Sequence, residues 1–480
     1  MKLVSVKGLK PHIMKRIIFL FGLFILSFLS QGQTIYSLTY LDSTSSRINV
    51  RIKPSKLFRT PVSFVMPRSV PGSYGITLYD VFISNLYAIT LSGERVAMVK
   101  DDNNAPRWNY TVPGVVLSEM EYEVDLRKME GKLAPSDASI IRAGFAGILN
   151  YSVFGWIEGT EYEPVRCEIR TFNHWPIFTT NEPALKLPIG TLRFETDNYF
   201  TLADGQIFMG PQTRIKEYKG RIPLFIAAYA QVGEEYLDDY GKQGIMSLDI
   251  LQDYFGELPF KQYTILLRKA LPLEPGSVPA FGMEHLQSST FFGDTSSFRA
   301  HEMSQQEFTR TIPTYLHHMG HAFIPLRCYG DTYLPHVTEI PPIISNIWFN
   351  EGFMWFLPYD TLHSEAMKKR FYTSIYQTTP EIKRMSLTQL SQAASTMYST
   401  DFRLGKSIYG RGALMAIEMN NYLKTKSGGK KSMKDILQYL YHWAKENKRP
   451  FTMDEFPMLI HKACGIDLDK MYNKWQLPIN

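Results

Sequence analysis

The segment YLHHMGH at residues 315–321, together with WFNEGF at residues 348–353, decides how the whole chain is interpreted. His317 and His321 are four residues apart, so on a helix their imidazoles lie on the same face. Glu351 adds a carboxylate from a second predicted helix. Two imidazoles and one carboxylate, with a fourth position left open, form the ligand set of a catalytic zinc site. The sequence therefore predicts one zinc ion held by His317, His321 and Glu351.

His318 departs from the signature that this first segment otherwise follows. In the H-E-x-x-H signature of zinc peptidases, the glutamate after the first histidine activates water. Here His318 occupies that position, so we expect it to stand in for the general base. An imidazole reaches less far than a glutamate, and a neighbouring dication favours its neutral form. Alternatively, His318 is a fourth ligand, which would close the site and make it structural.

Other histidines offer alternative metal sites. Five of the eleven histidines fall within residues 285–321, a clustering that requires a cause. His318 and His321, three residues apart, could ligate together, but His317 would then leave the shared face, so we favour His317 with His321. His301 and Glu302 begin like the signature, but the second histidine is missing.

Two carboxylates lie in surroundings that suggest a role at this site. Glu351 stands among four aromatic residues, where a buried carboxylate would be costly without a cation as partner. Glu284 lies in the segment Gly282-Met283-Glu284-His285, which follows a predicted strand and a Pro/Gly-rich lead-in. On an edge strand beside a zinc site, Glu284 could hold a free α-amino group.

The N-terminus has the pattern of a targeting segment. Basic Lys15 and Arg16 precede an apolar run at residues 17–29, and Ser30-Gln31-Gly32 resembles a cleavage site. The run is too short to span a bilayer comfortably. We expect a cleaved signal peptide within residues 1–32 (about 14–32, if Met14 rather than Met1 is the start). The protein would then be secreted or periplasmic and keep no transmembrane anchor.

Charge and cysteine content exclude two further classes. The formal charge is +6, but residues 1–32 contain five basic residues and no acidic residue, so the mature chain would carry +1. This near-neutral balance argues against a nucleic-acid partner. Cys167, Cys328 and Cys464 are too few and too widely spaced for a disulfide framework, and at most one pair could form a bridge.

Hydrophobic periodicity predicts an α+β protein in which strands precede helices. Residues 33–188 read as an N-terminal β domain, with period-two segments at residues 48–52 and 122–126 and frequent turn signals. Residues 189–480 form a second domain, which is mixed at first and helical from about residue 304. Helical spacing is also predicted for residues 233–255.

Helix boundaries follow from capping and proline signals. The helix with the histidines should start near Thr311, since Pro313 is tolerated only in a first turn. Ser345 is the expected N-cap of the second helix, which should end before Pro358. Two capping boxes are predicted further on, Ser432 with Asp435 and Thr452 with Glu455.

Five spaced motifs resemble the glycyl aminopeptidase family of gluzincin zinc metallopeptidases. They appear in one order over nearly the whole mature chain, which makes the combination more specific than any single motif. The motifs are PGSY at residues 71–74, YFGELPF at 254–260, GMEH with two serines at 282–289, WFNEGF at 348–353 and YGRGAL at 409–414.

The resemblance implies a fold and a set of residue roles. It implies an N-terminal β-sandwich-like domain and a thermolysin-like catalytic domain, with zinc held by His317, His321 and Glu351. Glu284, with Gly282 and Met283 beside it, would bind the amino terminus of a peptide or protein substrate. Tyr409 would donate a hydrogen bond to the oxyanion. Many members carry a PDZ domain, which we expect to be absent here.

Three functions remain open at this point. The chain could be a zinc aminopeptidase with an unusual base, acting on peptides with a free amino terminus. It could be a pseudopeptidase that keeps the fold and the metal but binds a peptide or partner without turnover. It could also be a structural module with a vestigial site. The substitution at His318, with the surrounding motifs intact, favours impaired or absent peptidase activity.

Overall fold

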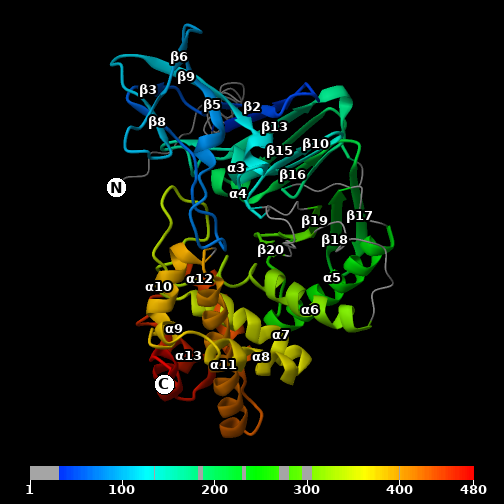
Figure 1. Ribbon diagram of the computed structural model, residues 1–480, viewed down its shortest axis with the longest axis vertical. Coiled ribbons are helices and arrows are strands. Elements are labelled where there is room, and N and C mark those ends of the chain that lie inside the picture. Colours follow the sequence, from blue (N-terminus) through cyan, green and yellow to red (C-terminus); the bar gives the residue numbers. More distant parts are fainter. Residues whose placement is uncertain are drawn as a thin grey trace, which may run out of the picture.

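The computed structural model describes residues 32–134, 136–181, 187–229, 234–269, 281–293, 305–398 and 400–479. Its N-terminal half is built from β-sheets and its C-terminal part from helices, as Figure 1 shows. The α+β class predicted from the sequence is therefore confirmed. The predicted signal peptide, apart from Gly32, lies outside the described residues, and so does the pair His301–Glu302.

The largest sheet has eight strands in the order β15-β13-β1-β2-β9-β5-β6, with β3 paired to β9. Buried residues alternate with partly exposed residues along β1 and with exposed residues along β2, because only one face of the sheet covers the core. The predicted strands at residues 48–52 and 122–126 lie in β2 and β9. The bounds are β1 Thr34–Tyr40, β2 Arg47–Lys53, β3 Phe58–Arg59, β5 Ile83–Thr90, β6 Arg95–Ala97, β9 Val116–Asp125, β13 Val165–Thr171 and β15 Thr191–Thr196.

Two four-stranded sheets, ordered β12-β4-β8-β7 and β10-β11-β16-β14, complete the N-terminal half. β15 and β16 follow residue 188 in the sequence but pair with strands that precede it. The domain boundary predicted near residue 188 stays a prediction. The strands are β4 Val62–Val65, β7 Val99–Lys100, β8 Arg107–Tyr110, β10 Ile140–Arg142, β11 Phe145–Leu149, β12 Trp156–Ile157, β14 Ile177–Thr179 and β16 Gln206–Met209. The short helices are η1 Tyr79–Phe82, α2 Leu126–Glu130, α3 Asn150–Val153, η2 Phe172–His174 and α4 Tyr199–Asp204.

A five-stranded sheet joins the two halves and carries Glu284. Its order is β17 (Thr213–Lys219), β18 (Pro223–Tyr229), β19 (Tyr263–Lys269), β21 (Ser288–Gly293), β20 (Phe281–Glu284). β18, β19 and β21 run parallel, and α5 (Glu234–Phe255) supplies the crossover between β18 and β19. β20 pairs antiparallel with β21 at the edge, so the predicted edge-strand position of Glu284 is confirmed.

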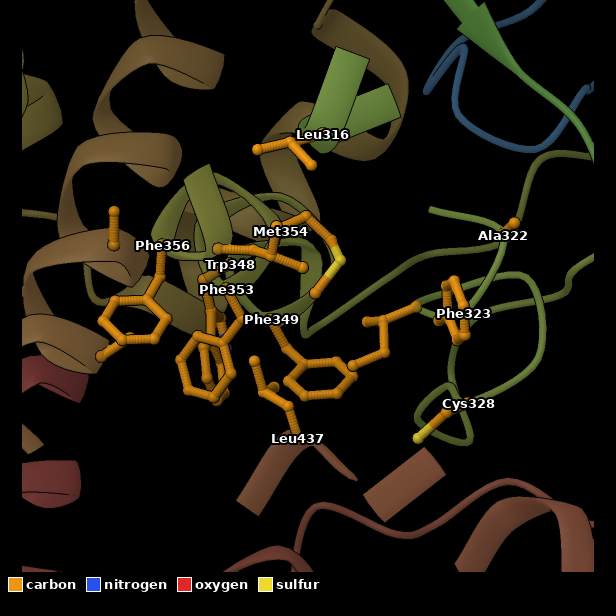
Figure 2. Close-up of a cluster of buried hydrophobic side chains, with 14 of the residues drawn as sticks. Leu316, Ala322, Phe323, Cys328, Trp348, Phe349, Phe353, Met354, Phe356 and Leu437 are labelled. Carbon is orange, nitrogen blue, oxygen red and sulfur yellow. The ribbon is translucent and has the colours of Figure 1, made fainter. Parts of the chain in front are cut away.

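The helical part packs around the aromatic residues of η3, a π-helical segment spanning Trp348–Phe353. Figure 2 shows Trp348, Phe349 and Phe353 clustered with Phe323 and Leu437. The helices are α6 Gln305–Gly320, α7 Met354–Leu362, α8 Glu365–Tyr376, α9 Pro380–Lys383, α10 Leu387–Met397, α11 Phe402–Ser427, α12 Met433–Asn447, α13 Phe456–Cys464 and α14 Asp469–Gln476.

Both predicted capping boxes are confirmed. The Asp435 carboxylate accepts hydrogen bonds from the backbone N–H and the hydroxyl of Ser432, each at 2.9 Å. The Thr452 hydroxyl accepts from the N–H of Glu455 at 3.2 Å, and the Glu455 carboxylate accepts from the N–H of Thr452 at 3.0 Å.

Three predicted helix boundaries are wrong. α6 starts at Gln305 rather than near Thr311, so Pro313 lies inside it. Ser345 is not the N-cap of η3; its hydroxyl shares a 3.0 Å hydrogen bond with Thr332 instead. Pro358 lies inside α7, which continues to Leu362. Each proline removes one helix hydrogen bond and crowds the preceding turn, and packing of the helix faces compensates for that cost.

Cys167, Cys328 and Cys464 are buried and free. Among the described residues, no helix has both the length and the apolar character needed to cross a bilayer.

Candidate metal centre

His317, His321 and Glu351 bring three ligand atoms together where the end of α6 meets η3. Nε2 of His317 lies 3.2 Å from Nε2 of His321. Oε2 of Glu351 lies 3.4 Å from the first nitrogen and 3.6 Å from the second. Ligand atoms bound to zinc at about 2.0–2.1 Å in tetrahedral geometry are about 3.3–3.4 Å apart. The triangle therefore has the dimensions of a zinc site.

Burial makes this arrangement costly without a cation. His317, His321 and Glu351 are each at most 3% exposed, and Glu284 lies close to His321 and Glu351. Burial and the neighbouring charge of His321 lower the pKa of His317 to about 3. Burial alone would also lower the pKa of His321, but the carboxylates of Glu284 and Glu351 raise it to about 9. Two buried carboxylates beside two imidazoles are a ligand set that favours a dication, which would take the place of the proton on His321.

Each ligand has a neighbour that fixes its orientation. Nδ1 of His321 lies 3.0 Å from the carbonyl oxygen of Ile324, so an N–H at Nδ1 leaves Nε2 free as a ligand. The ring of His317 stacks on Trp355, with centroids 4.2 Å apart. Oε1 of Glu351 accepts a 2.8 Å hydrogen bond from the hydroxyl of Tyr74. The donor set and its supports therefore fit a metal ion.

Glu284 faces the same space from β20. Although burial opposes ionisation, the charges of His321 and His318 lower the pKa of the Glu284 carboxyl. Gly282 lies two residues earlier on the same face of the strand. A Cβ on Gly282 would lie 2.5 Å from Nε2 of His318, so the glycine provides the room for that ring. Met283 points to the opposite face and is buried there, which leaves its backbone as the part that could meet a substrate.

His318 lies beside the triangle and contacts Glu284. Its Nδ1 atom is 3.3 Å from Oε2 of Glu284, and its ring meets that of Phe291 edge-on. A ring nitrogen of His318 also lies within 4.8 Å of the ligand atoms of His317 and His321. Both roles predicted for His318, general base and fourth ligand, therefore remain compatible with its place.

Tyr409 reaches the site from α11. Its ring centroid is 6.1 Å from that of His317 and 6.2 Å from that of Trp355. Among the described residues, the Tyr409 hydroxyl has no hydrogen-bond partner. The ring of Tyr409 therefore lies beside that of the metal-ligand candidate His317.

His285, by contrast, faces away from the centre. Its Nε2 lies 2.9 Å from the Gln206 amide nitrogen and its Nδ1 3.3 Å from the Asp204 carboxylate, while Tyr151 stacks on its ring. These contacts tie β20 to the N-terminal half and leave the imidazole without a role at the metal centre.

Tyr74 and Trp355 are the site residues that the sequence did not identify. Tyr74 belongs to the PGSY motif, which supported the family resemblance but was given no role at the metal site. Trp355 follows WFNEGF by two residues, and only the packing of α7 against α6 shows that it supports His317.

Comparison with known proteins gives two findings. Residues 35–211 match the sequence model of the Peptidase M61 N-terminal domain. No curated protein sequence matches the chain at a significant level.

Solved zinc metallopeptidases share the fold along nearly the whole chain. An aminopeptidase N family protein from Idiomarina loihiensis is 18% identical with a TM-score of 0.76, covering 93% of this chain and 77% of that one. The M1 zinc metallopeptidase from Deinococcus radiodurans is 16% identical with a TM-score of 0.54, covering 93% of both chains. A mutant of the latter, bound to a Tyr-Ser-Ala substrate, aligns to the same extent with the same TM-score.

Proposed function

We propose that this chain is a zinc-metallopeptidase-like protein of the glycyl aminopeptidase family that binds peptides or proteins through a free amino terminus. Its hydrolytic activity would be impaired by the substitution at His318. The observation that carries the proposal is the triangle of His317, His321 and Glu351, whose sides of 3.2–3.6 Å match tetrahedral zinc. The M61 N-terminal domain and a similar fold with a bound tripeptide support it.

The surrounding residues have complementary roles in this proposal. Zinc, when bound, polarises a substrate carbonyl and acidifies water. Glu284, held ionised in a buried position, would pair with the α-amino group of the substrate. The backbone of Gly282 and Met283 on the edge strand would pair with the peptide backbone. The free hydroxyl of Tyr409 would donate to the oxyanion.

His318 limits catalysis because it takes the place of the proton acceptor. One of its ring nitrogens is engaged by Glu284 at 3.3 Å, the carboxylate that we assign to the substrate amine. A positioned general base typically contributes about 10²–10⁴-fold to the rate. We therefore expect slow turnover that depends on metal, positioning and the Tyr409 donor.

A pseudopeptidase is the second candidate. The same contact between His318 and Glu284 favours it, because proton transfer is compromised while the metal triangle and the amine-binding carboxylate are intact. Such a protein would bind a peptide or a partner protein through its amino terminus without cleaving it.

We further propose that the protein works outside the cytoplasm, after cleavage of a signal peptide within residues 1–32. The support is the basic start, the apolar run and the small residues that follow it. N-terminal sequencing of the exported protein tests this, and a mature chain that still begins at Met1 or Met14 would overturn it.

The decisive experiment combines metal analysis with aminopeptide turnover. Wild type, His317→Ala and His318→Glu are purified, and zinc content and hydrolysis of alanyl and glycyl substrates are measured. We expect one zinc ion per chain in wild type and His318→Glu, loss of zinc in His317→Ala, and much faster hydrolysis by His318→Glu than by wild type. If zinc content is unchanged in His317→Ala, the triad is wrong. If wild type is as fast as His318→Glu, activity is not impaired.

A further inference from the structure

The turn Pro71–Tyr74 extends from the N-terminal half to the metal centre. It follows β4 and precedes η1, yet Tyr74 is 4% exposed and belongs to the hydrophobic core of the helical part. Gly72 and Tyr74 have left-handed φ values of 81° and 44°. A left-handed aromatic residue is disfavoured by roughly 1–2 kcal/mol and persists where its surroundings require it.

Backbone hydrogen bonds hold this turn against the chain that leads into η3. The N–H groups of Arg68 and Ser69 both donate to the carbonyl of Thr338 at 3.0 Å, and the N–H of Thr338 donates back to Ser69 at 3.0 Å. Nearby, Arg107 and Glu339 form an ion pair at 2.7 Å. The turn is thus fixed relative to η3, and with it relative to Glu351.

Tyr74 determines which oxygen of Glu351 faces the two histidines. Its hydroxyl donates to Oε1 at 2.8 Å, whereas Oε2 lies 3.4 and 3.6 Å from the histidine nitrogens. The Tyr74 ring packs against Tyr398 with centroids 5.3 Å apart, which fixes its direction. Oε1 is therefore occupied by a donor, and Glu351 presents one oxygen rather than two to a cation.

We propose that Tyr74 is a positioning residue of the metal centre, so that the N-terminal β half completes the zinc site of the helical half. The proposal rests on the proposed zinc site. By occupying Oε1 of Glu351, Tyr74 would leave Oε2 as the oxygen that this carboxylate offers to the metal. Partners of this kind typically contribute about 10–100-fold to metal affinity.

The test removes only the Tyr74 hydroxyl. Tyr74→Phe keeps the ring and its packing on Tyr398, and Tyr36→Phe is the matched control, since the buried Tyr36 hydroxyl has no partner among the described residues. Zinc dissociation constants of wild type and both variants are measured by chelator competition at one pH. The visible spectrum of the cobalt-substituted proteins is a second readout, because it weakens as the coordination number rises above four.

We expect Tyr74→Phe to bind zinc about 10–100-fold more weakly than wild type, with a weakened cobalt spectrum, and Tyr36→Phe to match wild type. If Tyr74→Phe matches wild type in both readouts, the proposal for Tyr74 is overturned while the zinc site stands. If wild type itself binds no zinc, the proposed function fails and this inference fails with it. Circular dichroism and thermal unfolding of the metal-free proteins check that both variants fold.

Discussion

The Nδ1 atom of His318 lies 3.3 Å from Oε2 of Glu284, so the residue in the general-base position contacts the carboxylate that we assign to the substrate amine. The His318 ring can take this place because Gly282 has no Cβ, which would lie 2.5 Å from its Nε2. The substitution therefore changes two parts of the site, the proton acceptor and the surroundings of Glu284.

His318→Ala separates the two roles considered for His318. If His318 is not a metal ligand, the variant should keep one zinc ion per chain and lose less affinity than the about 10–100-fold typical of an outer-shell partner. His321→Ala, which removes a corner of the triangle, should lose more than that. Zinc titration against a chelator measures both. Equal losses in the two variants would instead make His318 a fourth ligand.

Gly72→Ala should weaken peptide binding by acting on Glu284. A Cβ at Gly72 would lie 2.2 Å from Oε1 of Glu284, so the carboxylate must move. We expect the dissociation constant of an unhydrolysed tripeptide with a free amino terminus to rise about tenfold or more, equivalent to about 1.4 kcal/mol. Isothermal titration calorimetry measures this with or without turnover.

Gly93→Ala is the matched control for this prediction. Its φ of 87° is close to the 81° of Gly72, but a Cβ there meets nothing within 4 Å. Both variants should therefore carry similar backbone strain, of roughly 1 kcal/mol. If they bind the tripeptide equally well, Gly72 has no effect through Glu284.

Gly412→Ala should destabilise the protein even though it lies inside α11. In an exposed helix, such a change stabilises by roughly 0.5–1 kcal/mol. Here the new Cβ would lie 2.4 Å from the carbonyl oxygen of Trp348 in η3, so we expect a loss of about 1–3 kcal/mol in the free energy of unfolding. Gly131→Ala, with its nearest contact at 3.5 Å, is the control. Urea unfolding measures the free energy of unfolding of both variants. A stabilised Gly412→Ala would contradict the close approach of α11 to η3.

Local patterns predicted much of the fold but little of the contact between its halves. Period-two strands, the 3.6-period helix α5 and both capping boxes depend on near neighbours, and all are present. The positions of Pro313 and Pro358 were mispredicted because the packing of buried helix faces outweighs one missing N–H.

In the candidate site, too, local patterns and motifs predicted some residues, whereas contacts between distant parts of the chain were not predicted. The spacing of His317 and His321 is local and could be read directly, and family motifs pointed to Glu284, Glu351 and Tyr409. The Tyr74–Glu351 hydrogen bond joins residues 277 positions apart, and no periodicity encodes such a contact. The π-helical form of η3 was likewise not predicted, although π turns are often found at functional sites.

Asp80 should make stability depend on pH only in acid. Its fully buried carboxylate accepts hydrogen bonds from Arg68 at 2.8 Å and Lys100 at 2.6 Å. Burial raises the pKa of Asp80, but these two cations outweigh it and lower the pKa overall. Because the folded pKa is below the unfolded value of about 3.9, the contribution is complete above that pH and is lost as the pH falls through the folded pKa.

Asp80→Asn tests this directly. At pH 7 the variant should unfold about 3–5 kcal/mol more easily, since two cations lose their buried partner, and the difference from wild type should shrink below about pH 4. The exposed Asp197, which forms no ion pair among the described residues, provides the control variant Asp197→Asn. Denaturant unfolding at several pH values measures the effect, and a difference that persists unchanged at pH 3 would contradict it.

Tyr409→Phe should reduce turnover without affecting the metal. The Tyr409 ring lies 6.1 Å from that of His317, and its hydroxyl has no partner among the described residues, so the variant should keep its zinc affinity and its stability. Loss of one oxyanion donor typically lowers kcat by about 10²–10³-fold. Because wild-type turnover is expected to be slow, the comparison is best made in the His318→Glu background, with aminopeptide hydrolysis as the assay. A fall in kcat at constant zinc content supports the donor role; an unchanged kcat would reduce Tyr409 to a packing residue beside Trp355 and Phe402.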